Sequence, residues 1–290
     1  MRYKVAEHLI EITIAESEYN SFSMLPSFAP FLTEEEGEVL FSLHVDDTIR
    51  PDREIEMIGD FELGDGRTKV FLRENGGYQY IINNIHGSSC CLLKTDKTFR
   101  RCQCALRGNE SMRHFGLNNA IMFVFAFAGS FQQTLLIHAS TIKYNGFGYP
   151  FIAKSGTGKS THSQLWLNNI PGSELMNDDN PAIRIIDGKA FIFGTPWSGK
   201  TPCYRQVSAP LGAITRIDRA LTNSIDKLAP VEAFASFLPA CSSMKWDHDI
   251  YDNICQTITD IIEQTPVYTL HCRPDAEAAQ VCSTTITTRQ

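Results

Sequence analysis

The sequence predicts a mixed α+β and α/β protein, in which an antiparallel, β-rich N-terminal domain precedes an α/β domain. Residues 1–112 contain strand-length apolar runs between turn residues, with little helical periodicity. Residues 116–132 are mostly apolar and contain no proline, which predicts a buried helix. Beyond this helix, strand and helix patterns alternate, as they do in α/β domains. We therefore expect one domain over residues 1–112 and a second over residues 113–290.

In the first domain, strands are expected wherever apolar residues alternate or run together over strand lengths. One hairpin is expected around Asn75-Gly76, because this dipeptide between two β patterns is a strong turn signal. A second strand pair is expected on either side of residues 95–97. The expected strands cover residues 9–14, 39–45, 69–73, 78–82, 90–94 and 98–106.

In the second domain, five strands alternate with helices. Pro171-Gly172 is expected to end the helix that follows the glycine-rich segment near residue 156. The expected strands cover residues 135–142, 149–153, 182–186, 190–194 and 267–270. The expected helices cover residues 159–167, 230–239 and 248–264, and a further helix is expected at the C-terminus.

The composition disfavours several classes of partner. A net charge of −7 argues against a dedicated nucleic-acid binder, because affinity for the phosphate backbone comes from clustered lysine and arginine. The longest uncharged apolar segment, residues 120–131, is shorter than the ~20 residues that span a bilayer. The nine cysteines show no paired C-x-x-C spacing, so we expect free thiols. Together these features predict a cytoplasmic protein without a nucleic-acid or membrane partner.

A glycine-rich segment lies between a predicted strand and a predicted helix. It matches the phosphate-loop pattern G-x-x-x-x-G-K-[ST] at Gly158, Lys159 and Ser160, with Ala153 in place of the first glycine. The start of a helix presents unpaired N–H groups and the positive end of the helix dipole, which together bind polyphosphates. The alternative is a glycine-serine turn that caps a helix and binds nothing.

The chemistry of such a loop gives each residue an expected role. Lys159 reaches the β- and γ-phosphates of a nucleotide, and the Ser160 hydroxyl binds Mg²⁺. Gly156 and Gly158 allow the backbone to curl without Cβ clashes. The residues expected to bind the nucleotide are Ser155, Gly156, Thr157, Gly158, Lys159, Ser160 and Thr161.

Two adjacent carboxylates, Asp178 and Asp179, follow the loop by 18 and 19 residues from Ser160. A phosphotransferase uses one carboxylate to bind Mg²⁺ and often another to accept the proton of the acceptor hydroxyl. The alternative is a surface turn, because residues 177–181 have the composition of one.

Three further residues are candidates for the site. His138 ends an apolar run, where a histidine is either structural or catalytic. Lys200 and Arg205 lie in a segment after a predicted strand, where a cation either neutralises a transferring phosphate or remains in solvent.

The order of His138, the segment 155–160 and the Asp178-Asp179 pair resembles the HPr kinase/phosphorylase family and its relatives. The catalytic domain of that family is similar to phosphoenolpyruvate carboxykinase, so the resemblance implies a carboxykinase-like α/β domain that contains the phosphate loop. It covers roughly residues 133–200 and reaches weakly to Asp275. It also implies that His138 lies near the transferred phosphate, that Asp178 is the base and that Asp179 is a metal ligand.

The sequence therefore predicts an ATP-dependent phosphotransferase of the HPr-serine-kinase type, with Mg²⁺ as its metal. Its expected acceptor is a serine hydroxyl on a protein or peptide. The first domain is expected to present the acceptor or to mediate assembly, which leaves a homo-oligomer open. Two alternatives remain open as well. One is a nucleotide-binding sensor or adaptor without transfer activity, which Ala153 favours, and the other is a kinase for a small metabolite such as free serine.

Overall fold

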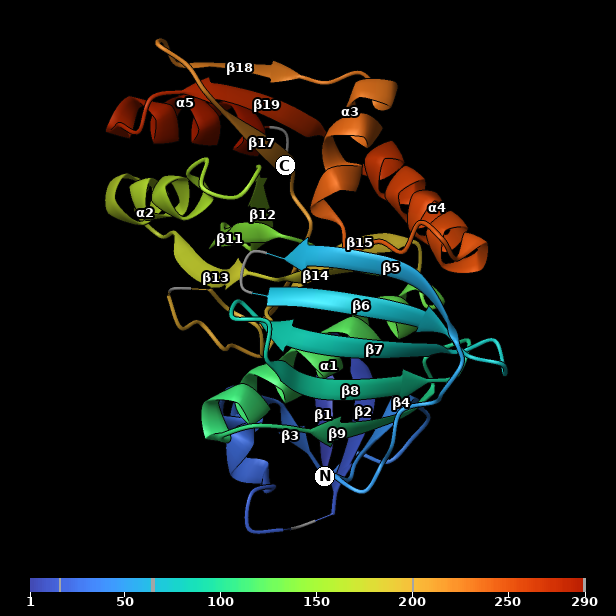
Figure 1. The fold of residues 1–290 in the computed structure, drawn as a ribbon. Helices are drawn as coiled ribbons and strands as arrows, with labels where there is room; N and C mark the ends of the chain where they lie inside the picture. Colours follow the sequence, from blue (N-terminus) through green and yellow to red (C-terminus); the bar gives the residue numbers. More distant parts are fainter. Residues whose placement is uncertain (16, 64–65, 200, 289–290) are drawn as a thin grey trace. The chain divides into compact units, whose positions relative to one another are not determined.

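The computed structural model describes residues 1–15, 17–63, 66–199 and 201–288. The chain divides into two compact units, Met1–Phe131 and Gln132–Gln290 (Figure 1). The sequence predicted the division between residues 112 and 113, whereas the structure has it after Phe131. Both units mix helices with strands, and strands predominate among the described residues.

The first unit contains a nine-stranded sheet in the order β3-β1-β2-β4-β9-β8-β7-β6-β5, counted over the described part of the chain. The strands are β1 (Arg2–Val5), β2 (His8–Ile14), β3 (Leu32–Thr33), β4 (Val39–Val45), β5 (Glu56–Leu63), β6 (Gly66–Leu72), β7 (Tyr78–Asn84), β8 (Ser89–Thr95) and β9 (Arg101–Leu106). The helical elements are η1 (Phe22–Met24), η2 (Pro26–Phe31) and α1 (Glu110–Ser130).

The prediction of an antiparallel first sheet needs a correction, because this sheet is mixed. Strand β4 lies parallel to β2 on one side and parallel to β9 on the other. The connections explain the difference. The chain passes through η1, η2 and β3 between β2 and β4, and through β5 to β8 between β4 and β9. Each of these long connections returns the chain to the same end of the sheet, which parallel pairing requires. The hairpin at Asn75-Gly76 is confirmed, since β6 and β7 are antiparallel and Gly76 has φ +78°.

Helix α1 belongs to the first unit, which explains why the division falls after Phe131. The Arg113 guanidinium donates to Asp47 at 2.7 Å and to Asn20 at 2.8 Å, both in the first unit. Gly116 allows α1 to lie close to β8, because a Cβ atom there would be 2.8 Å from the Cys90 carbonyl oxygen. The apolar face of α1 thus completes the core of the first sheet.

Within the described residues, the second unit contains two sheets, in the orders β10-β14-β15-β16 and β13-β11-β12-β17-β19-β18. The strands are β10 (Thr134–Leu136), β11 (Ala139–Tyr144), β12 (Phe147–Ile152), β13 (Glu174–Asp179), β14 (Ala182–Ile186), β15 (Lys189–Phe193), β16 (Ser208–Pro210), β17 (Ile214–Arg219), β18 (Ser224–Lys227) and β19 (Val267–Cys272). The helices are α2 (Lys159–Asn169), α3 (Pro230–Phe237), η3 (Leu238–Ala240), α4 (His248–Gln264) and α5 (Ala276–Thr287).

The strand predicted over residues 135–142 is two strands in the structure. Strand β10 pairs with β14 in the four-stranded sheet, and β11 pairs with β12 and β13 in the six-stranded sheet. The chain changes sheets at Ile137 and His138, so a single strand cannot continue. This change leaves His138 immediately before the start of β11, which pairs with the end of β13.

The six-stranded sheet positions the candidate site. Its central strands β12, β17 and β19 are parallel, so their carboxyl ends meet at one edge. Helices α2 and α5 pack together in the second unit (Figure 1). The core here includes the fully buried Trp166 of α2 and Phe151 of β12, with ring centroids 5.6 Å apart. This packing fixes the start of α2 against the end of β12.

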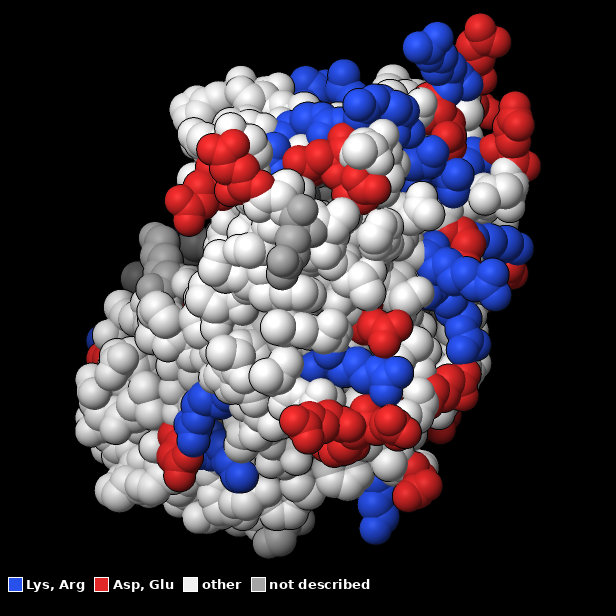
Figure 2. Space-filling view, turned by 90° about the horizontal axis from the view of Figure 1, so that it is seen from below, with Lys and Arg blue, Asp and Glu red and all other residues white. Residues whose placement is uncertain are grey.

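Charged side chains of both signs lie side by side in mixed clusters on the face shown in Figure 2. Among the ion pairs of the first unit, Arg67 pairs with Asp60 at 2.6 Å. Within the described residues, no helix is both long and apolar enough to cross a bilayer. All nine cysteines are free, as the sequence predicted.

Candidate functional site

The glycine-rich loop connects β12 to α2, as the sequence predicted. Gly156 has φ +76° and Gly158 has φ +129°, conformations in which any other residue is strained. Gly158 occupies the N-cap position of α2 and therefore offers no side chain to the first N–H groups of the helix. Because helix N–H groups at this end have no partner within the helix, they are available to an anion.

Lys159 is buried at the first position of α2 and is only 8% exposed. Its ammonium group donates to the Ala153 carbonyl oxygen at 3.2 Å, so the side chain folds back over the loop. Burial lowers the pKa of Lys159, and the carboxylates of Asp179 and Asp178 oppose this shift by favouring the charged form. The lysine thus faces the interior of the loop, beside two acids.

Strand pairing brings the two aspartates to the loop. On β11, Ala139 pairs with Ile152 at the end of β12 and, on its other side, with Asp179 at the end of β13. The neighbouring Asp178 is buried, and its Oδ1 accepts a hydrogen bond from Ser160 Oγ at 2.8 Å. The predicted metal-binding serine therefore contacts the first of the two acids.

The second acid, Asp179, contacts a different partner. Its Oδ1 lies 3.1 Å from His138 Nδ1, and its Oδ2 accepts a hydrogen bond from Asn180 at 2.9 Å. The Asp179 side chain is 35% exposed, so solvent can reach it. Its φ of +146° is a strained conformation for a residue with a Cβ atom. Strain of this kind persists only where the surrounding contacts enforce it.

Those contacts come from the segment that follows β15. Ser198 donates a hydrogen bond to the Asp178 carbonyl oxygen at 3.1 Å, and Ser198 also forms an isolated β-bridge with Asp179. Thr195 donates to the Asn180 carbonyl oxygen at 2.6 Å. A Cβ atom on Gly199 would lie 3.3 Å from the Asp179 Cβ atom, which is a tight approach. The segment thus holds the backbone of both aspartates in place.

Arg219 is a residue of this site that the sequence analysis missed. It ends β17, the parallel neighbour of β12, and its guanidinium donates to the carbonyl oxygens of Gly156 and Thr157, at 2.5 and 2.8 Å. These bonds turn two carbonyl groups of the loop towards the arginine. The signal that could have found it is an arginine at the carboxyl end of a strand next to the loop strand.

Of the two cations predicted for the site, only Arg205 lies within the described residues. Arg205 donates to the Leu175 carbonyl oxygen at 2.6 Å and pairs with Glu174 at 3.1 Å. Both partners lie at the start of β13, whereas Asp178 and Asp179 lie at its end. The structure therefore does not bring Arg205 to the glycine-rich loop. Lys200 lies outside the described residues.

Two cavities border the loop in the second unit. One, of about 460 Å³, is lined by the second half of the loop at Thr157 and by the exposed Thr161 of α2. The other, of about 510 Å³, is lined by the first half of the loop at Ser155 and by His138. The loop thus presents one half to each cavity. All the residues predicted for nucleotide contact lie in the loop or the first turn of α2.

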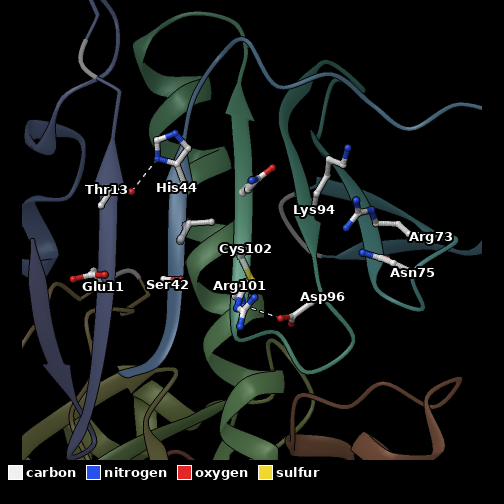
Figure 3. A pocket seen from close by; sticks show the side chains of 12 residues that line it. Glu11, Thr13, Ser42, His44, Arg73, Asn75, Lys94, Asp96, Arg101 and Cys102 are labelled. Carbon is white, nitrogen blue, oxygen red and sulfur yellow. Dashed lines mark hydrogen bonds between the residues drawn. The ribbon is translucent and has the colours of Figure 1, made fainter. Parts of the chain in front are cut away.

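A further cavity, of about 600 Å³, lies on the sheet of the first unit (Figure 3). Figure 3 shows Thr13 facing His44 across neighbouring strands, where Thr13 Oγ1 and His44 Nδ1 are 2.9 Å apart. Two cations of its wall, Arg73 and Lys94, both pair with Asp52. One carboxylate thus pairs with both cations, and this cavity lacks the glycine-rich backbone of the loop.

Comparisons with known proteins add little to this description of the site. No family model matches the chain, and no curated protein matches it. The solved structure of the HPr(Ser) kinase/phosphatase from Coxiella burnetii is similar to this chain at 11% sequence identity. The similar region covers 52% of this chain and 93% of that one, with a TM-score of 0.31. A likeness at this score does not establish a shared fold.

Proposed function

We propose that this protein is an ATP-dependent phosphotransferase of the HPr-serine-kinase type, with a carboxykinase-like second unit. The observation that carries the proposal is the contact between Ser160 of the loop and Asp178, with Lys159 folded over the same loop. A hydroxyl and a carboxylate side by side beside a lysine provide the ligands that an Mg²⁺–nucleotide complex needs. The His138–Asp179 pair at the same strand end adds a group for the acceptor.

The loop fits the polyphosphate of a nucleotide. Nothing lies within 4 Å of the position that a Cβ atom would occupy on Gly156, so the loop has open space beside it. The first N–H groups of α2 are uncapped by any side chain. Ser160 and Asp178 offer only oxygen ligands, which is the donor set that Mg²⁺ prefers, completed by water and phosphate oxygens. Mg²⁺ bound here would neutralise charge on the transferring phosphate.

The contacts favour an exchange of the two aspartate roles expected from the resemblance. Asp178 is buried and bonded to Ser160, which supports metal binding by Asp178. Asp179 is more exposed and bonded to His138, which supports proton acceptance by Asp179. A base must lie within hydrogen-bond reach of the acceptor hydroxyl, so the accessible carboxylate suits this role better. His138 would orient the Asp179 carboxylate.

The acceptor would approach the cavity that His138 and Ser155 line. We assign it to a serine hydroxyl of a protein or peptide, as the resemblance implies. The free cysteines are compatible with a reducing compartment such as the cytoplasm.

Incubation of the purified chain with γ-labelled ATP, Mg²⁺ and a library of serine peptides tests the proposal. We expect label on a peptide, and we expect Lys159→Met to reduce transfer by about 100-fold or more, because a preorganised cation at the phosphates is lost. Lys143→Met is the control, since Lys143 on β11 donates to the Ser208 carbonyl oxygen, away from the loop. Nucleotide binding with neither transfer nor hydrolysis would instead indicate a sensor.

A further inference from the structure

The cavity of about 600 Å³ in Figure 3 is formed by residues of the first unit alone. Helix α1 covers one face of the sheet there, because it contacts β4, β7, β8 and β9. Gly116 of α1 lies against Cys91, and strand pairing places Leu93 and Cys104 on the same face as Cys91. Gln103 lines the cavity and directly precedes Cys104, so its side chain points to the opposite face. The cavity therefore lies on the face of the sheet that α1 leaves uncovered.

Strand pairing arranges polar side chains in two rows on this face. In the first row, Thr13 of β2 pairs with His44 of β4, His44 with Gln103 of β9, and Gln103 with Lys94 of β8. The second row lies two residues earlier on β4 and β9 and pairs Ser42 with Arg101. All six of these residues line the cavity, and we call them the polar face of the first unit: Thr13, Ser42, His44, Lys94, Arg101 and Gln103.

The cations of the cavity wall are not fully neutralised. Lys94 and Arg73 share one carboxylate, that of Asp52, which leaves one positive charge in excess. The backbone N–H of Arg101 donates to Asp96 (Figure 3), but the Arg101 guanidinium forms no hydrogen bond or ion pair with any residue that the structure describes. The polar face therefore has positive charge available to an anion.

The two acids of the same wall already have partners. Glu11 pairs with Arg2 at 3.2 Å. Asp96 accepts from two backbone N–H groups of the connection between β8 and β9, at 2.9 and 3.2 Å, so its carboxylate closes this turn. Neither carboxylate is therefore the partner that the Arg101 guanidinium lacks within the described residues.

Arg101 and Lys94 have nearly the spacing of alternate side chains in an extended peptide. Lys94 lies opposite Gln103, and Arg101 is two residues from Gln103 on the same strand. Neighbouring strands are ~4.8 Å apart and two residues of a strand span ~7 Å, so the backbones of the two cations lie about 8 Å apart. In an extended peptide, side chains on one side repeat every ~7 Å. Two carboxylates at alternate positions of such a peptide can therefore pair with both cations.

The net charge of −7 does not oppose binding of an acidic peptide at this place. At physiological ionic strength, charges more than ~8 Å away are largely screened, so the side chains of the polar face decide the interaction. A single-stranded nucleic acid fits less well, because its bases stack on aromatic side chains. The described residues that line the cavity include no Phe, Tyr or Trp.

We propose that the polar face of the first unit binds an extended acidic segment of a partner peptide or protein. Carboxylates of this segment pair with Arg101 and Lys94, and the Gln103 amide bonds to the peptide backbone between them. The inference goes beyond the proposed function and does not depend on it, because it uses no residue of the glycine-rich loop or of the second unit.

Fluorescence anisotropy on the full chain tests the inference in the absence of nucleotide. The probes are two fluorescein-labelled peptides of equal length, one alternating glutamate with serine and the other glutamine with serine. We expect the glutamate peptide to bind at least ~10-fold more tightly at low salt, with a smaller difference at high salt. Arg101→Gln should weaken binding of the glutamate peptide at least ~5-fold. Arg67→Gln is the matched control, because it removes the same charge from an exposed arginine of β6 outside the cavity wall, and it should change the affinity less than ~2-fold.

Gln103→Lys distinguishes a direct contact from a folding defect, since a damaged fold does not improve binding. We expect this variant to bind the glutamate peptide several-fold more tightly than the unmodified chain. The inference is overturned if the glutamate peptide binds no better than the glutamine peptide, or if Arg67→Gln weakens binding as much as Arg101→Gln. A labelled polyuridine RNA is the third probe. Tighter binding of this RNA than of the glutamate peptide, lost in Arg101→Gln, would assign the polar face to nucleic acid instead.

Discussion

The hydroxyl of Ser160 donates to Oδ1 of Asp178 at 2.8 Å, and this bond joins the start of α2 to the end of β13. The next residue, Asp179, contacts His138 instead. Successive side chains of a strand point to opposite faces, so two adjacent acids cannot both contact the serine. The strand geometry therefore separates the carboxylates into one beside the loop and one beside the histidine.

This separation predicts different defects for two isosteric substitutions. Asp178→Asn should raise the Mg²⁺ concentration needed for half-maximal transfer by about 10-fold or more, because a charged ligand is replaced by a neutral one. Asp179→Asn should leave Mg²⁺ dependence and nucleotide affinity nearly unchanged and reduce the transfer rate by roughly 10²–10⁴-fold, the usual value of a general base. Steady-state kinetics over a range of Mg²⁺ concentrations measures both.

If Asp178→Asn instead reduces the transfer rate and Asp179→Asn raises the Mg²⁺ requirement, the result supports the roles that the family resemblance implied, with Asp178 as base and Asp179 as metal ligand. Asp226→Asn, on the exposed part of β18, is a matched control that should change neither quantity.

The strained backbone of Asp179 gives a prediction about stability. Asp179→Ala and Asp179→Gly both remove the carboxylate, but only alanine retains a Cβ atom at φ +146°. We expect the glycine variant to be more stable than the alanine variant by about 1 kcal/mol, since relief of strain outweighs the added chain entropy. Urea unfolding followed by tryptophan fluorescence measures the difference, because Trp166, Trp197 and Trp246 all lie in the second unit. An alanine variant of equal or greater stability would contradict strain at this position.

Elements with a complete local pattern could be predicted from the sequence. The strands 39–45 and 182–186 and the helix 248–264 have the same bounds in the structure. In each, the period of apolar residues and the flanking polar or turn residues agree. For the helix, the side chain of Asp247 caps the first turn by accepting from the Ile250 N–H at 3.0 Å. The local sequence pattern alone was therefore sufficient to predict these three elements.

Features that depend on distant parts of the chain could not be predicted in this way. The break at His138 arises because β10 and β11 pair with different sheets, which no local pattern records. Strand β17 was missed because charged residues interrupt its short apolar pattern, and Arg219 was missed with it. The division after Phe131 reflects contacts of α1 with distant strands and loops of the first unit, such as the ion pair between Arg113 and Asp47, which are 66 residues apart.

Arg219 should act on nucleotide binding through the shape of the loop. Arg219→Met removes two hydrogen bonds to loop carbonyl groups, and we expect the Kd values of both ADP and pyrophosphate to rise about 10-fold, or about 1.4 kcal/mol. Arg219→Lys should recover only part of this loss, since an ammonium group lacks the forked donors of a guanidinium. The control is Arg100→Met, because Arg100 is an exposed arginine that pairs with Glu38 in the first unit. A change confined to ADP would show that Arg219 acts on the nucleoside and not on the loop.

The buried His162 should make the stability of the second unit depend on pH. Burial lowers the pKa of His162 to about 4, from the 6.5 of an unperturbed histidine. Between these values the unfolded chain binds a proton at His162 and the folded chain does not, so the free energy of unfolding falls as pH falls from 6.5 towards 4. The shift corresponds to about 3 kcal/mol at most. Above pH 6.5 both states are neutral, and the contribution of this residue is constant.

Urea unfolding at a series of pH values between 7.5 and 4 measures this dependence, and His162→Gln should flatten it. Other groups titrate over the same range, so the difference between the unmodified chain and the variant isolates the histidine. Trp166→Phe removes the donor to His162 Nε2 but leaves the ring buried. Because burial is the cause of the shift in the His162 pKa, this variant should keep the pH dependence. Loss of the dependence in Trp166→Phe would show that the tryptophan bond, and not burial, keeps the imidazole neutral.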